Sequence, residues 1–153
     1  MTSKNIIYLL LITFAAALIN GCVSQPCLDN TVSAVNVTFY KTGGLAFTAD
    51  SVTLYGLDRD TSKIYDKATK LAKISFPLDL SADSCSYFLK VNNVADTITL
   101  YYNSYPHLVT KECGFTYFSV LEDSINHKVD SIDYQVRNKY VTTANEENIR
   151  IFY

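Results

Sequence analysis

Apolar and polar residues alternate with a period of two along most of the chain after residue 34. Neighbouring side chains of a strand point to opposite faces, so short alternating runs indicate strands with one buried face. The runs are rich in Val, Ile, Thr, Tyr and Phe, the residues that strands favour. We predict strands over residues 35–40, 52–55, 74–78, 87–91, 97–100, 115–121, 132–136 and 149–151.

Turn-forming residues separate these runs. They include Gly43-Gly44, Asn92-Asn93 and Tyr105-Pro106. The spacing predicts an all-β fold, an antiparallel β-sandwich of immunoglobulin-like architecture with about seven to nine strands. We expect a single sandwich domain over residues 34–153, because no repeat and no internal linker interrupts the pattern.

Residues 63–73 fit the alternation less well. Ile64, Ala68 and Leu71 recur there at helical spacing. The stretch has no capping residues and is short for an isolated helix. We therefore interpret it as a hairpin, with a short helix as the alternative.

The amino terminus has the pattern of a signal peptide. Lys4 precedes an apolar run from Ile6 to Ile19, which as a helix would be about 21 Å long at ~1.5 Å per residue. Since a bilayer core is about 30 Å thick, the run is too short for a permanent membrane span. We expect residues 1–21 to be removed as a signal peptide.

The residues that end this run, Leu18-Ile19-Asn20-Gly21-Cys22, resemble the lipobox of bacterial lipoproteins. The resemblance implies diacylglyceryl transfer to the Cys22 thiol, cleavage after Gly21 and acylation of the new amino terminus. Two or three acyl chains anchor a protein stably, whereas one binds marginally. Residues 22–33 would then form the lipidated anchor segment and linker. The alternative is an ordinary secretory peptide that a Cys follows by chance.

Three cysteines remain if Cys22 is acylated, namely Cys27, Cys85 and Cys113. An oxidising compartment then allows one disulfide and one free thiol. The spacing alone does not choose among the three possible pairs. We favour Cys27 with Cys113, a pair that would staple the segment after the anchor to a late strand.

Several short motifs accompany the lipobox Cys and the second Cys soon after it. They are Val52 to Leu57, Phe76-Pro77-Leu78, Glu112-Cys113-Gly114-Phe115 and the closing Ile149-Arg150-Ile151. Together they resemble a family of small Bacteroidota lipoproteins of unknown function, over most of residues 22–153. The resemblance implies an envelope location and supports the pairing of Cys27 with Cys113, which match the family's cysteines. It implies no chemistry.

Charge and motif content argue against several function classes. The 13 Lys and Arg face 15 Asp and Glu, so a strongly basic nucleic-acid binder is excluded. Hydrolase nucleophile motifs are missing, and neither His107 nor His127 has metal-ligand spacing. We therefore predict no enzymatic activity, no cofactor and no metal site. An enzyme would need an acidic pair such as Glu112 and Asp123 to converge in a cleft.

The leading hypothesis is a non-enzymatic module that acyl chains anchor in the membrane and that contacts another envelope protein. No acidic cluster follows Cys22, which favours an outer-membrane lipoprotein facing the periplasm. The alternative is a ligand face of Tyr40, Tyr55, Tyr101 and Tyr102 that binds a glycan or peptidoglycan fragment, because exposed Tyr rings stack on sugars. A contiguous exposed apolar patch would favour the protein partner, and a concave Tyr-lined pocket the small ligand.

Overall fold

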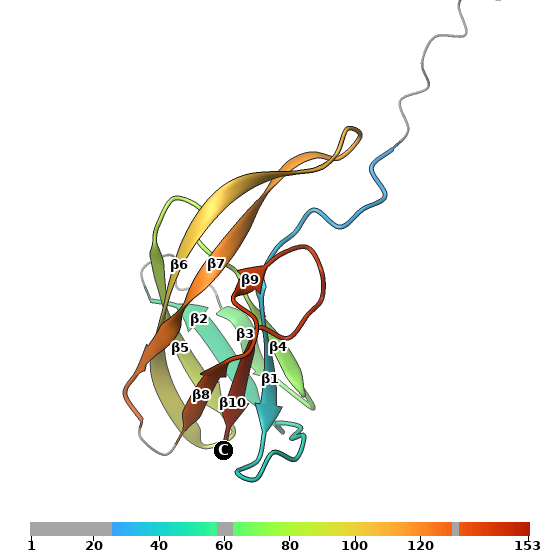
Figure 1. Ribbon diagram of the computed structural model, residues 1–153. Coiled ribbons are helices and arrows are strands. Elements are labelled where there is room, and N and C mark those ends of the chain that lie inside the picture. Colours follow the sequence, from blue (N-terminus) through green and yellow to red (C-terminus); the bar gives the residue numbers. More distant parts are fainter. Residues whose placement is uncertain (1–25, 58–62, 130–131) are drawn as a thin grey trace, which may run out of the picture.

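A computed structural model describes residues 26–57, 63–129 and 132–153 of the chain, coloured from blue to red in Figure 1. These residues form two β-sheets packed as a sandwich, and no helix is present among them. The predicted all-β sandwich is confirmed. Residues 1–25, which contain the expected signal peptide and Cys22, lie outside the described residues.

Ten strands lie within the described residues. In chain order they are β1 (Val35–Tyr40), β2 (Val52–Gly56), β3 (Lys63–Ala68), β4 (Lys73–Phe76), β5 (Ser84–Val91), β6 (Val94–Thr110), β7 (Gly114–His127), β8 (Asp133–Val136), β9 (Tyr140–Val141) and β10 (Ile149–Phe152). Each strand expected from the alternation forms. The additions are β3 and β9, and the second of these has only 2 residues.

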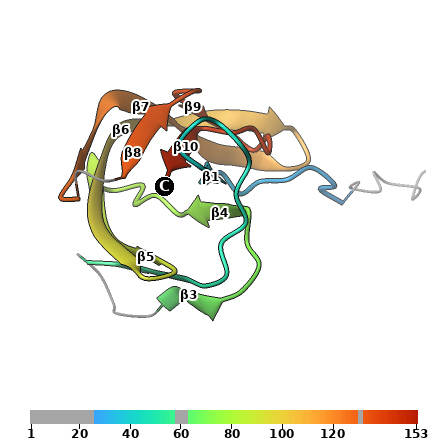
Figure 2. The same cartoon turned by 90° about the horizontal axis from the view of Figure 1, so that it is seen from below.

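The two sheets differ in size. The four-stranded sheet has the order β4-β1-β10-β8, and the six-stranded sheet has the order β3-β2-β5-β6-β7-β9. Strands β1 and β10 pair in parallel, whereas the other pairs are antiparallel. Figure 2 shows the six-stranded sheet curving around the four-stranded one.

The hydrophobic core lies between the two inner faces. Every second residue of β1 and of β5 enters it, as the alternation predicts. The largest fully buried side chains are Phe39, Phe76, Leu54, Ile74, Leu89, Ile98, Leu100, Ile132, Ile149 and Ile151. They come from both sheets, so folding buries one continuous apolar layer.

Residues 63–73 form a strand rather than the alternative helix, but they do not pair with one another as a hairpin. Strand β3 pairs with β2, which places Tyr65 opposite Leu54. Lys73 begins β4, which pairs with β1 in the other sheet. The chain therefore crosses from one sheet to the other within this stretch.

A buried carboxylate, that of Asp96, links the two sheets. Its Oδ1 accepts hydrogen bonds from the main-chain nitrogens of Thr97 at 2.7 Å and Lys128 at 3.0 Å. Its Oδ2 accepts a hydrogen bond from the Tyr134 hydroxyl at 2.9 Å, and His127 Nδ1 lies 3.9 Å away. A carboxylate is tolerated at this depth because donors reach both oxygens. Strand β6 of one sheet is thereby joined to β8 of the other.

We expect the substitution Asp96→Asn to lower the free energy of unfolding by about 1–2 kcal/mol. The amide keeps the shape of the side chain but replaces one charged acceptor with a donor. Urea denaturation measures the loss. Asp123→Asn is the control, because that carboxylate is 77% exposed in its ion pair with Lys139 and is expected to contribute under about 0.5 kcal/mol. Equal losses in the two variants would contradict a special role for Asp96.

Candidate interaction surface

The hairpin of β6 and β7 extends well beyond the sandwich (Figure 1). The pairing of β5 with β6 ends where Ser84 lies opposite Tyr101, yet β6 continues to Thr110. At ~3.4 Å per residue, the part of β6 after Tyr102 is about 27 Å long. We call residues 103–118 the arm.

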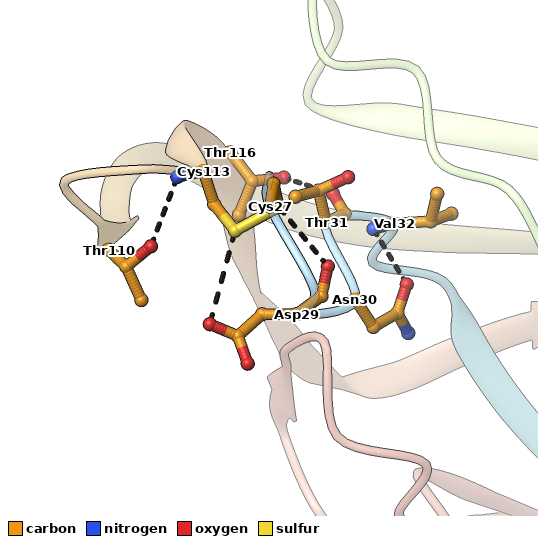
Figure 3. Close-up of a disulfide and its surroundings, with 8 residues drawn as sticks. All are labelled: Cys27, Asp29, Asn30, Thr31, Val32, Thr110, Cys113 and Thr116. Carbon is orange, nitrogen blue, oxygen red and sulfur yellow. Dashed lines mark hydrogen bonds between the residues drawn. A yellow bond between two sulfur atoms is a disulfide. The ribbon is translucent and has the colours of Figure 1, made fainter. Parts of the chain in front are cut away.

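A disulfide between Cys27 and Cys113 staples the N-terminal segment to the end of the arm (Figure 3). The two Cα atoms are 4.7 Å apart, and the residues are separated by 86 positions in sequence. The pairing favoured from the sequence is confirmed. Thr116 Oγ1 also donates a hydrogen bond to the carbonyl oxygen of Thr31 at 2.6 Å, so the segment lies along β7.

The turn at the end of the arm explains the Glu-Cys-Gly motif. Gly114 has a φ of 72°, in the left-handed region that favours glycine. The Cys113 main-chain nitrogen donates a hydrogen bond to Thr110 Oγ1 at 3.0 Å, which closes the turn. The glycine thus permits the bend that presents Cys113 to Cys27.

One face of the arm carries three ring side chains, two of which contact the third, Phe118. His107 stacks on Phe118 with 4.1 Å between ring centroids and an interplanar angle of 16°. Tyr105 meets the same Phe118 ring edge-on at 6.3 Å. Tyr105 is 40% exposed, and His107 is exposed as well. We call Tyr105, His107 and Phe118 the aromatic ladder.

The other face continues the inner face of the sheet past the point where the core ends. Leu108 and Phe115 lie opposite each other near the turn, and both are exposed, Phe115 by 72%. Leu28, which follows the stapled Cys27, is exposed too. We call Leu28, Leu108 and Phe115 the apolar tip. Exposed apolar groups gathered at one end of a protein make a candidate interaction site.

Pro106 limits how a partner can bind the arm. The carbonyl oxygen of Tyr117 accepts a hydrogen bond from the Ser33 hydroxyl at 2.5 Å, so it points away from β6. In an antiparallel pair, the N–H and C=O groups of two directly opposite residues either both point toward the partner strand or both point away from it. Pro106 lies opposite Tyr117, so its main-chain groups also point away, toward the outer edge of β6. The outer edge of β6 therefore lacks an N–H at Pro106, which disfavours the addition of another strand. A partner is therefore expected to contact the side chains of the arm rather than to add a strand to this edge.

The four tyrosines of the expected ligand face do not lie together. Tyr102 is only 3% exposed, so its inclusion was wrong. Its hydroxyl contacts Cys85 Sγ at 3.0 Å and donates to the carbonyl of Asp79 at 2.8 Å. Tyr40 belongs to the four-stranded sheet, whereas Tyr55 and Tyr101 belong to the six-stranded one.

The three other tyrosines already have partners of their own. The Tyr40 hydroxyl donates to Glu147 at 2.8 Å, and Tyr55 stacks on Phe88 with centroids 4.8 Å apart. The Tyr101 hydroxyl accepts a hydrogen bond from Asn126 Nδ2 at 3.0 Å, and the depression that Tyr101 borders is too shallow to enclose even a water molecule. None of these three tyrosines therefore lines the concave pocket that a small ligand would favour.

The acidic pair considered for catalysis is also separated. Glu112 lies in the turn of the arm, and Asp123 lies along β7 after about 30 Å of strand. Asp123 Oδ2 is paired with Lys139 Nζ at 2.7 Å. Within the described ranges, no group of three or more His, Cys, Asp or Glu is placed to hold a metal ion. The described residues also include no helix that is long and apolar enough to cross a bilayer.

Residues 51–153 match a protein family of unknown function, DUF6452. The chain belongs to this family. The DUF6452 match runs from the start of β2 to the end of the chain, so it includes the arm and Cys113 but neither β1 nor Cys27. No curated protein and no solved structure matches the chain.

Proposed function

We propose that the protein is a lipid-anchored, non-enzymatic module of the cell envelope that contacts another envelope protein through its arm. The lipobox-like residues before Cys22 and the resemblance to small Bacteroidota lipoproteins support the anchor. The same features support an outer-membrane location, and the absence of an acidic cluster directly after Cys22 supports an orientation toward the periplasm.

The main support for the proposed protein contact is the aromatic ladder. Tyr105 and Phe118 present a large rigid area whose burial costs little side-chain entropy, and Tyr is enriched at the centres of protein interfaces. The ring contacts hold these side chains in place before any partner binds. The staple likewise restrains the arm, and such preorganisation lowers the entropy lost on association.

A photocrosslinking amino acid at position 105, in the full-length protein in its native cells, tests this proposal. We expect one envelope protein to be captured reproducibly from position 105 and identified by mass spectrometry. The added substitution Phe118→Ala is expected to reduce capture about tenfold, as the loss of ~1.4 kcal/mol of binding energy at a central aromatic would.

Position 64 provides the matched control for this experiment. Ile64 is 38% exposed, close to the 40% of Tyr105, but lies on β3 at the opposite edge of the six-stranded sheet. The same product from both positions, or no product from position 105, would contradict a contact through the ladder.

A further inference from the structure

The staple brings the arm close to the proposed anchor. Cys22 and Cys27 are five residues apart, so their Cα atoms are separated by at most about 18 Å. Cys27 is bonded to Cys113 in the turn of the arm. Without the disulfide, the hydrogen bonds of Thr31 and Ser33 to β7 would be left to restrain the segment, and the first strand residue, Val35, is thirteen residues from Cys22 and up to about 45 Å away. The disulfide therefore shortens the tether and selects the end of the molecule that meets the membrane.

The side chains at that end suit a lipid surface. Phe115 is 72% exposed, and Leu108 and Leu28 are also exposed, so the apolar tip lacks cover from the described chain. Lys111 in the turn is accompanied by two acidic residues, Glu112 and Asp29, whose Oδ2 lies 3.9 Å from Cys113 Sγ, so the contact relies on apolar groups and not on attraction to anionic lipid. Aromatic and aliphatic groups of this kind gain free energy by leaving water for the boundary between headgroups and acyl chains.

The main chain of the arm limits how deeply the arm can enter a membrane. The outer edge of β6 after Tyr102 has no neighbouring strand among the described residues. Unpaired main-chain groups are not stable in the hydrocarbon core, so only the end of the arm is suited to lipid contact.

We propose that the apolar tip inserts into the interfacial region of the membrane that holds Cys22, an inference that rests on the proposed acylation of that residue. The tip and the acyl chains then make two contacts with one bilayer. Two contacts fix the orientation of the sandwich, with the tip toward the lipid and the end that carries the loop after β1 away from it (Figure 1). The aromatic ladder, on the side of the arm, stays above the surface and available to a protein.

The chain contains no Trp, so a single introduced Trp reports on one position. We would compare Phe115→Trp with Leu45→Trp, since both wild-type side chains are 72% exposed. Leu45 belongs to the loop after β1. This loop is at the end of the sandwich opposite the arm (Figure 1). The acylated full-length proteins are reconstituted in vesicles of phosphatidylethanolamine and phosphatidylglycerol, with and without phospholipids brominated near the top of the acyl chains.

We expect brominated lipid to quench most of the Phe115→Trp emission and to leave the Leu45→Trp emission unchanged. Equal responses of the two variants would overturn the proposal. Flotation of the wild-type protein with the same vesicles separates the two hypotheses. If the protein does not float, the anchor is absent and the tip contact falls with it. If it floats but Phe115→Trp is not quenched, the tip contact alone is wrong.

Discussion

Raising the pH above about 10 is expected to unfold the sandwich, because four tyrosines must stay protonated in the fold. Burial is the main cause that raises the pKa of Tyr87, Tyr102, Tyr134 and Tyr153 well above the usual 10.0. For Tyr134 the hydrogen bond to the Asp96 carboxylate raises the pKa further. In the unfolded chain the same phenols lose their protons near pH 10.0, which stabilises the unfolded state as the pH rises.

The sign and size of this effect follow from proton binding. The folded state holds more protons than the unfolded state above pH 10, so stability is full below that pH and falls as the pH rises. Each proton that only the folded state retains lowers the free energy of unfolding by about 1.4 kcal/mol per pH unit, and four such protons lower it by about 5 kcal/mol per pH unit. Since a domain is stable by only about 5–15 kcal/mol, unfolding is expected within one to three pH units. Urea denaturation at about pH 8, 10 and 11 measures the slope.

Tyr153→Phe provides a sharp control for the alkaline transition. The Tyr153 hydroxyl is buried and has no hydrogen-bond partner among the described residues. Removing it is expected to raise stability at neutral pH by about 1 kcal/mol, because an unsatisfied polar group leaves the interior. The same variant should reduce the alkaline slope by about 1.4 kcal/mol per pH unit. A slope equal to that of the wild type would show that Tyr153 is not one of the responsible groups.

The alternation of the sequence predicted the core because it records directly which face each residue occupies. Val35, Val37 and Phe39 alternate with polar residues, and all three are fully buried. The same rule places Ile98, Leu100 and Tyr102 on one face. Continued to residues 101 and 102, the rule indicates that Tyr102 faces the core and Tyr101 faces solvent. The sequence therefore already argued against including Tyr102 in a ligand face.

The pairing of the strands was harder to predict from the sequence, because local alternation does not identify a strand's neighbours. Strand β3 joins β2, whereas β4 joins β1, and nothing within residues 63–73 distinguishes the two destinations. The predicted turn at Tyr105-Pro106 was also wrong. Pro106 lies inside β6, opposite Tyr117. A proline is accommodated there because the outer edge of β6 needs no main-chain donor at that position.

The arm was missed for a related reason. Its residues continue the alternation of β6 and β7, so the sequence alone does not reveal that the neighbouring β5 ends at Ser84. Leu108 and Phe115 are exposed because the arm extends past the four-stranded sheet that covers the inner face elsewhere, and not because of their own pattern. The Glu112-Cys113-Gly114 motif was the usable signal, since a glycine between two long alternating runs is typical of a hairpin turn.

We expect the loss of the disulfide between Cys27 and Cys113 to be the most destabilising covalent change to the chain. The chain-entropy model gives about 4–5 kcal/mol for a loop as long as the 86-residue separation of Cys27 and Cys113. We expect the double variant Cys27→Ser/Cys113→Ser to lose about 4 kcal/mol of unfolding free energy, because the unfolded chain regains the conformations that the loop excludes. The loop includes β1 to β6, so the restraint acts on most of the sandwich.

A soluble Cys22→Ser form without the signal peptide allows the measurement by urea denaturation at neutral pH. Cys85→Ser in the same background is the matched control, because Cys85 is free and the substitution leaves the disulfide intact. Adding a reductant to the unsubstituted soluble form should reproduce the loss seen in the double variant and leave the double variant itself unchanged. If the double variant is as stable as the Cys85→Ser control, the disulfide does not stabilise the sandwich. Its remaining effect would then be to hold the arm beside the N-terminal segment.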